Sequence, residues 1–94
     1  MEIVGVRHKG LRRYLTRNDS RGVPSAFTAK LDQMVSALIA APDEEEIRTP
    51  AGWRLHRLSG DRAGTYNMRV SGNWRLTFRV VDNTVVALDL EDYH

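Results

Sequence analysis

Apolar and polar residues alternate along the chain from residue 66 to residue 80. The apolar residues fall on every second position: Tyr66, Met68, Val70, Trp74, Leu76, Phe78 and Val80. A period of two predicts two β-strands, each with one buried face. Turn-forming residues 71–73 separate them, and matching the two apolar rows requires a three-residue loop with Val70 opposite Trp74. The polar positions then place Arg69 opposite Arg75, an unfavourable pair that suggests a bound anion.

A third strand is predicted after the next polar turn. Its apolar positions match those of the preceding strand when Val86 lies opposite Val80. The same register puts Glu91 beside Arg75. The last residues of the chain therefore belong to the rim of the face that carries the arginines.

The first half of the chain has a helical period instead. After a short apolar segment at residues 3–6, expected to be a strand, apolar residues recur at helical spacing in residues 8–18 and 25–41. Pro42 ends the second helix. The acidic residues 43–46 suit the first turn of a short third helix, because carboxylates are favourable at the positive end of the helix dipole.

Helices followed by antiparallel strands predict an α+β fold, with N-terminal helices packed on one face of a small antiparallel sheet. Residues 53–58 can add another strand, which carries His56. A length of 94 residues suits one domain, residues 1–94. The chain has no cysteine, which excludes disulfides and thiolate metal sites.

The basic residues change this picture by pointing to a partner. Only Lys9 and Lys30 of the fourteen Lys and Arg residues are lysine, and residues 7–30 and 48–79 each carry seven basic residues against one acid. Guanidinium groups bind phosphate and carboxylate through paired hydrogen bonds, so we expect an anionic partner. No apolar run approaches the ~20 residues of a membrane span, and signal-peptide features are missing. We expect a cytoplasmic protein that contacts no membrane.

The residue types near the end of the chain suit RNA cleavage without a metal or other cofactor. Such a reaction needs a base for the ribose 2′-hydroxyl, an acid for the leaving 5′-oxygen and positive donors at the phosphate. His56 or His94 can act as base or acid near neutral pH, and Asp92 can orient one of them. Arg75 is the candidate for the phosphate. Tyr93 is the candidate for base stacking or for a hydrogen bond at the scissile group.

Several motifs resemble one bacterial family. They are HKGL at 8–11, GVP at 22–24, LHRLSGDRAGTY at 55–66, NWRLTF at 73–78 and EDYH at 91–94. In order and spacing they resemble the HigB toxins of type II toxin–antitoxin systems, a branch of the RelE superfamily. The resemblance implies a RelE-like fold and an endoribonuclease that cuts mRNA in the ribosomal A site. It also implies neutralisation by HigA, a helix-turn-helix antitoxin through whose complex the toxin reaches operator DNA.

The resemblance also assigns roles to particular positions. It implies an active site made of His56, Arg75, Asp92, Tyr93 and His94. Ser59 departs from the pattern, because several relatives have lysine before the GDR motif; Arg54 or Arg57 can replace that contact.

The basic segments are expected to bind RNA and the ribosome, whose rRNA is a large anionic surface. The expected contact residues are Lys9, Arg12, Arg13, Arg54, Arg57, Arg62, Arg69, Asn73 and Arg79. The alternative function is that of the ParE branch of the same superfamily, a non-catalytic toxin that poisons DNA gyrase. The terminal DYH and the two histidines favour RNA cleavage.

Overall fold

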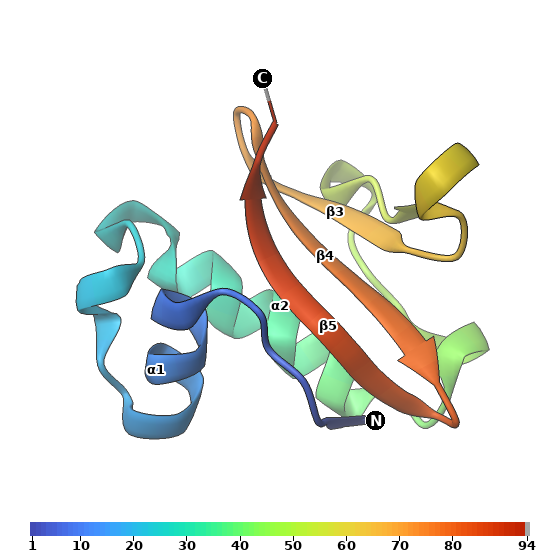
Figure 1. Cartoon of the computed structure of the whole chain (residues 1–94), viewed down its shortest axis with the longest axis horizontal. Helices are drawn as coiled ribbons and strands as arrows, with labels where there is room; N and C mark the ends of the chain where they lie inside the picture. Colours follow the sequence, from blue (N-terminus) through green and yellow to red (C-terminus); the bar gives the residue numbers. More distant parts are fainter. Residues whose placement is uncertain (94) are drawn as a thin grey trace.

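A single five-stranded sheet forms the centre of the computed structural model, which describes residues 1–93; His94 lies outside the described residues. The strand order is β1-β5-β4-β3-β2. The strands are β1 (Glu2–Ile3), β2 (His56–Arg57), β3 (Tyr66–Ser71), β4 (Trp74–Val81) and β5 (Thr84–Asp92). Figure 1 shows β3, β4 and β5 as the long, twisted part of this sheet, with the C-terminal end of β5 beside the β3–β4 turn.

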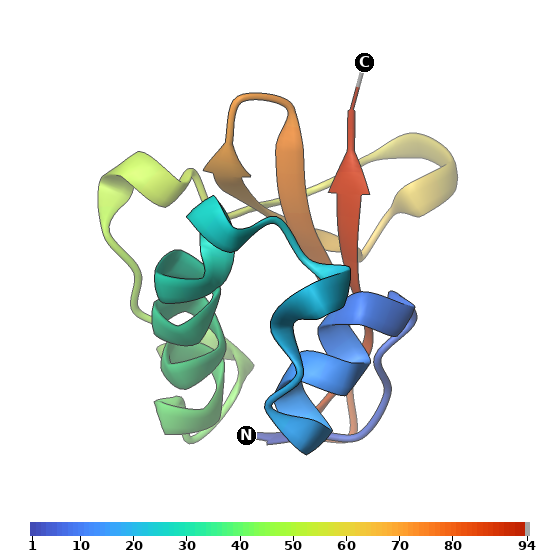
Figure 2. The same ribbon diagram turned by 90° about the vertical axis from the view of Figure 1, so that its left-hand side faces the viewer.

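Two α-helices, α1 (Lys9–Arg17) and α2 (Thr28–Ala40), supply the other half of the core. In Figure 2 they lie side by side in front of the strands. Five single 3₁₀ turns connect the elements: η1 (Ser20–Gly22), η2 (Ser25–Phe27), η3 (Glu44–Glu46), η4 (Ala51–Trp53) and η5 (Gly60–Arg62). Fully buried side chains from both halves meet in one cluster, which includes Leu11, Leu31, Leu38, Met68, Leu76 and Phe78. The predicted α+β architecture is confirmed.

The β3–β4 hairpin is tighter than predicted. Ser71, not Val70, lies opposite Trp74, and the register shifts between Arg69 and Ser71. The prediction of a three-residue loop was wrong, because Val70 is the extra residue of a bulge and remains buried with 1% exposure. The turn is left with two residues, and the first, Gly72, has a φ of 53°, which glycine adopts without strain.

The β4–β5 pairing also contains a bulge that the sequence pattern concealed. Val80 lies opposite Val85, so the predicted pairing of Val80 with Val86 was wrong. The register shifts between residues 77 and 79 of β4, where Ala87 of the facing strand has a left-handed φ of 54°. The bulge lets Val85 and Leu88, three residues apart, both reach the core at 0% exposure. Strict alternation does not allow this.

Three further expectations are corrected in detail. The segment expected as a strand at residues 3–6 forms β1 and an isolated bridge from Val6 to Leu88, both parallel to β5, so the sheet is not wholly antiparallel. The expected third helix is only the turn η3. The backbone N–H groups of Glu45 and Glu46 in this turn donate to the Asp43 carboxylate. The expected strand at residues 53–58 is reduced to β2.

The close contact between α1 and η1 yields a prediction about stability. A Cβ added at Gly10 lies 2.0 Å from the carbonyl oxygen of Gly22, which is backbone and cannot rotate away. We expect Gly10→Ala to lower the free energy of unfolding by about 1–3 kcal/mol. In a domain of this size each ~1 kcal/mol lowers Tm by roughly 4–8 °C. Thermal melts check this against the control Gly52→Ala, whose Cβ meets nothing within 4 Å; equal melting temperatures contradict the contact.

Candidate active site

The strand register assembles two rows of side chains on the polar face of the sheet. Residues paired across neighbouring strands share a face, because side chains alternate along each strand. One row runs from His56 in β2 through Asn67 and Thr77 to Asp89 in β5.

The second row places Arg69, Arg75 and Glu91 next to one another, as the sequence predicted. The row continues to Tyr93, whose backbone N–H donates to the Asn73 carbonyl at 2.8 Å. The end of the chain, as far as the structure describes it, is therefore tied to the β3–β4 turn.

Glu91 is the centre of a hydrogen-bonded cluster on this face. Arg62 from η5 binds it with both terminal nitrogens, at 3.1 Å to Oε1 and 2.6 Å to Oε2, and Thr77 donates its hydroxyl to the same carboxylate. Burial raises the pKa of Glu91. The hydrogen bonds from Arg62 and Thr77 and the charges of Arg62 and Arg7 together lower the pKa by more than burial raises it. The net pKa lies below its ordinary value, so the carboxylate is charged at neutral pH.

Tyr93 is held by the same cluster. Its hydroxyl oxygen accepts a hydrogen bond from Arg62 at 2.9 Å and from the Asn67 amide at 3.3 Å. Asn67 is only 2% exposed, whereas Tyr93 is half-buried. The guanidinium carbon of Arg75 lies 6.0 Å from the centre of the Tyr93 ring. Tyr93 thus has a defined position beside Arg75.

Arg75 keeps donors for a ligand. Its Nη1 donates to the carbonyls of Gly72, at 2.6 Å, and Trp74, at 3.0 Å, whereas the neighbouring Glu91 binds Arg62. A guanidinium has five N–H donors, so within residues 1–93 the Nε and Nη2 groups remain available. The charge of Arg69 on the facing strand adds to that of Arg75. The pair can bind an oxyanion bidentately.

His56 has a defined tautomer. Its Nδ1 lies 2.6 Å from the carbonyl oxygen of Arg54, and a carbonyl only accepts, so Nδ1 carries the hydrogen. In the neutral ring Nε2 is then an acceptor, which suits a base. The ring is exposed, on the β2 side of Asn67.

Asp92, which was also expected in the active site, lies on the other face of the sheet. Asp92 lies opposite Trp74 in β4, and Trp74 packs edge-on against Phe27 on the helix side of the sheet. Strand alternation therefore gives Asp92 the face opposite to that of Tyr93. His94 lies outside the described residues, so its role stays a prediction.

Some of the expected RNA-binding residues are engaged within the protein. Arg57 forms an ion pair with Glu44, and its guanidinium carbon lies 5.1 Å from the centre of the Tyr66 ring. The Tyr66 hydroxyl also donates to Glu44. Hydrogen bonds from Tyr66 and then from Arg57 lower the pKa of Glu44. Arg79 donates to the Ala63 carbonyl at 3.2 Å. These contacts fix the side chains without using every donor.

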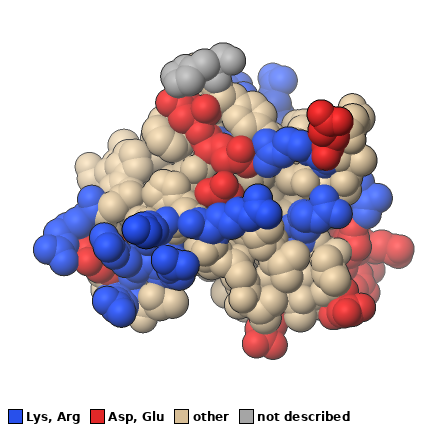
Figure 3. Space-filling model, viewed as in Figure 1, with Lys and Arg blue, Asp and Glu red and all other residues tan. Residues whose placement is uncertain are grey.

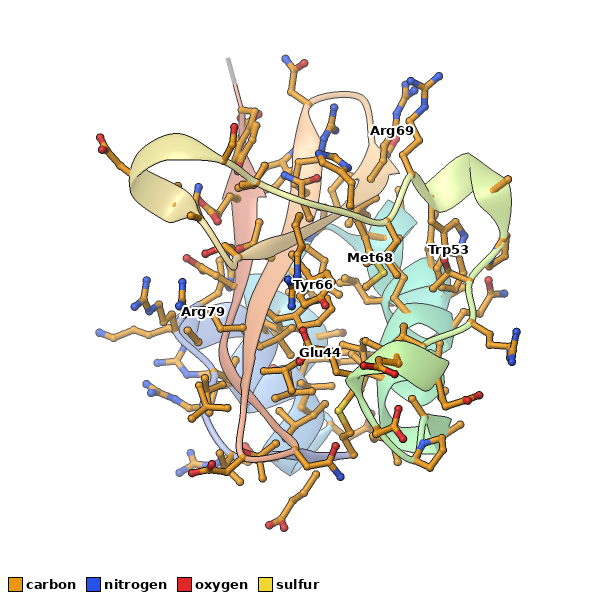
Figure 4. All side chains as sticks on the ribbon, turned by 90° about the vertical axis from the view of Figure 1, so that its right-hand side faces the viewer. Glu44, Trp53, Tyr66, Met68, Arg69 and Arg79 are labelled. Atoms are coloured by element: carbon orange, nitrogen blue, oxygen red, sulfur yellow. The ribbon has the colours of Figure 1, made fainter. Side chains whose placement is uncertain are left out.

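A basic band runs across the visible face. In Figure 3 Lys and Arg side chains extend from α1 over the sheet, with a group of Asp and Glu side chains above them in this view. In Figure 4 Arg79 projects from the side of the sheet opposite to Met68 and Trp53. Arg7, Arg62 and Arg79 line a hollow of about 200 Å³ there. Lys9, Arg12 and Arg13 continue the band on α1.

Two general observations concern metal ions and membranes. Among residues 1–93 no three His, Asp or Glu side chains converge in a way that can hold a metal ion. In the same part of the chain, neither α-helix has the length and apolar character needed to cross a membrane.

Sequence reasoning missed Asn67, Thr77 and Glu91 as members of the site. Their positions on the polar face followed from the alternation, but their hydrogen bonds did not. The one available signal was that Asn67 and Thr77 are polar residues in the middle of central strands. The alternation does not tell whether such a polar position is exposed or buried.

Comparison with known proteins identifies the family. Residues 5–94 match the family described as the RelE-like toxin of type II toxin–antitoxin system HigB. The chain belongs to this HigB-like toxin family. It is 32% identical to Endoribonuclease HigB of Proteus vulgaris over 92 residues, which cover 98% of this chain and 99% of that protein.

Further relatives agree with this assignment. The HigB-like chain is 32% identical to Toxin HigB-1 of Vibrio cholerae serotype O1 over 73 residues, which cover 78% of this chain and 77% of that protein. Crystal structures of YafQ from E. coli, one of a mutant and one from strain BL21(DE3), superpose with a TM-score of 0.60 each. Their identities are 17% and 16%, and each covers 95% of this chain and 89% of the other. They support the RelE-like fold alone.

Proposed function

We propose that this HigB-like chain is an endoribonuclease that cuts mRNA on the ribosome and thereby inhibits translation. The observation that carries the proposal is the juxtaposition of Arg75 and Tyr93 on the polar face of the sheet, 6.0 Å apart. A cation with available donors beside a fixed phenol suits a phosphodiester, whose phosphate is anionic and whose bases can stack on an aromatic ring. The relative named Endoribonuclease HigB supports the same activity.

The proposed reaction is attack by the ribose 2′-oxygen on the adjacent phosphorus. The P–O5′ bond breaks, its electron pair stays on the 5′-oxygen, and the products are a 2′,3′-cyclic phosphate and a 5′-hydroxyl. A base removes the 2′-hydroxyl proton and an acid protonates the 5′-oxygen. His56 and His94 are the candidates for these two roles, and Arg75 stabilises the charge that builds on the phosphate.

The proposed partners follow from charge and family. The band of Lys9, Arg12, Arg13 and the arginines of the sheet suits rRNA, which would hold the toxin at the A site. A HigA-like helix-turn-helix antitoxin is the proposed inhibitor, and operator DNA is reached only through that complex. The proposed place of action is the cytoplasm, where ribosomes translate.

A growth experiment tests the toxin activity. Expression of the chain alone in a bacterium is expected to arrest growth, because cleavage of translated mRNA stops protein synthesis. Primer extension on selected transcripts is expected to find new 5′ ends within translated codons. Arg75→Ala, expressed to the same soluble level, is the matched control and is expected to permit growth.

Two outcomes contradict the proposal in different ways. Normal growth with abundant soluble protein contradicts the proposed toxin activity. Growth arrest without new mRNA ends, accompanied by DNA breaks, instead supports the ParE-like alternative of gyrase poisoning.

A further inference from the structure

Asn67 has a feature that the protein's stability does not explain. Its side chain is 2% exposed, and its Oδ1 has no hydrogen-bond partner among residues 1–93. A buried carbonyl oxygen without a partner generally destabilises a fold, by about 1–3 kcal/mol. Such groups are rare in folded proteins, and one beside a candidate active site calls for a functional reason.

The other end of the same amide shows what Asn67 does. Its Nδ2 donates to the Tyr93 hydroxyl oxygen at 3.3 Å, and Arg62 Nη1 donates to that oxygen at 2.9 Å. A phenol oxygen has one hydrogen and can accept about two hydrogen bonds. With both acceptor positions occupied, the hydroxyl hydrogen of Tyr93 must point away from Asn67 and Arg62.

Arg62 is fixed by further bonds, and Asn67 is fixed by burial. Arg62 is fixed by its paired bonds to Glu91, at 3.1 and 2.6 Å, and Glu91 is fixed in turn by the Thr77 hydroxyl. Thr77 is 1% exposed and lies opposite Asn67 in the β3–β4 pairing. The two donors therefore come from a turn and a strand, and Thr77, which lies opposite Asn67, also bonds to the Glu91 that holds Arg62.

We propose that Asn67, together with the Arg62–Glu91 pair, is a positioning residue that keeps the Tyr93 hydroxyl as a hydrogen-bond donor to an oxygen of the scissile phosphate. This inference rests on the proposed function. It assigns Asn67 and Glu91 to the reaction without contact to RNA, and it gives Arg62 a role inside the protein. No bond is made or broken at Tyr93; its hydrogen bond strengthens as negative charge grows on the phosphate.

Single-turnover cleavage on ribosomes carrying a defined mRNA tests the inference through a double-mutant cycle. Tyr93→Phe removes the donor and is expected to slow cleavage by about 10²-fold. Asn67→Ala leaves the phenol in place but misdirects it, with an expected loss of roughly tenfold or more. In the Tyr93→Phe background Asn67→Ala is expected to cause no further loss, because Asn67 acts only through that hydroxyl.

A second variant separates positioning from packing. Asn67→Asp has nearly the same shape but only acceptor oxygens, so it draws the Tyr93 hydrogen inward; we expect cleavage to slow at least as much as with Asn67→Ala. The binding of the ribosome, measured as the toxin concentration at half-maximal rate, is expected to stay unchanged. Asn83→Ala is the control, because Asn83 donates to Pro42 at 2.9 Å in the turn at the other end of β4.

The outcomes distinguish the inference from the proposed function. Equal losses from Asn67→Ala with and without the Tyr93 hydroxyl overturn the inference, as does full activity of Asn67→Asp. If the alanine variant fails to fold, the aspartate variant decides. Full activity of Tyr93→Phe shows that Tyr93 takes no part in the reaction and so overturns the role given to Asn67. The proposed function is not affected by that result, because the unaltered protein still cleaves mRNA. Absence of any cleavage by the unaltered protein refutes the proposed function itself.

Discussion

Replacing Arg75 by alanine is expected to slow single-turnover cleavage of ribosome-bound mRNA by about 10²–10³-fold, the usual cost of losing one donor to a developing negative charge. Arg75 is the side chain of the polar face that lies beside Tyr93 and still has donors available within the described chain. Its two bonds to the carbonyls of Gly72 and Trp74 are replaced by bonds from water in the variant. The melting temperature is therefore expected to fall by only a few degrees.

Two further variants define what Arg75 supplies. Arg75→Lys is expected to recover little activity, because an ammonium cannot form the two parallel bonds of a guanidinium. Arg69→Ala removes a charge of the same sign from the facing strand and is expected to cost much less. An Arg75→Ala protein that unfolds marks the residue as structural, and one that cleaves at the full rate removes it from the reaction.

Replacing His94 by alanine is expected to slow cleavage by about 10²-fold or more, the usual contribution of a general acid or base. Binding of the ribosome is expected to survive, because it depends on basic residues distributed over α1 and the sheet. Single-turnover rates at saturating toxin, together with the half-maximal concentration, separate the two effects. His94→Gln, which keeps hydrogen-bonding capacity but cannot carry a proton at neutral pH, is expected to be as slow as the alanine variant.

The substrate provides the control for this experiment. A 2′-deoxyribose at the cut site is expected to block cleavage by the unaltered protein, and persistent cutting there contradicts attack by the 2′-oxygen. If His94→Ala cleaves at the full rate, His56 becomes the leading candidate. Its Nε2, the free acceptor of the ring, is then expected to act as the base.

The sequence predicted the faces of the strands better than their exact pairing. Alternation alone placed Arg69, Arg75 and Glu91 in one row, and the structure confirms that row. The two bulges were missed for a physical reason. A bulge at Val70 or Ala87 leaves the apolar count of a strand unchanged, while its extra residue shifts which residues lie opposite one another on the two sides of the bulge.

The cluster around Tyr93 was less predictable than the sheet. Arg62 is distant in sequence from Glu91 and belongs to a 3₁₀ turn without a periodic pattern, so no spacing rule connects the two. Asp92 is adjacent to Tyr93 in sequence, but neighbours along a strand point to opposite faces, so sequence proximity alone does not place the two side chains together.

The contact of Gly10 with Gly22 changes how genetic data on this chain should be interpreted. The backbone of each glycine blocks a side chain on the other, so the HKGL and GVP motifs together form one close backbone contact. Enlarging either residue strains the contact between α1 and η1 and lowers the stability of the fold, whatever the state of the catalytic face. Survivors selected for loss of toxicity are therefore expected to include large substitutions at these glycines, and such escape mutants report a loss of stability and not the loss of a catalytic group.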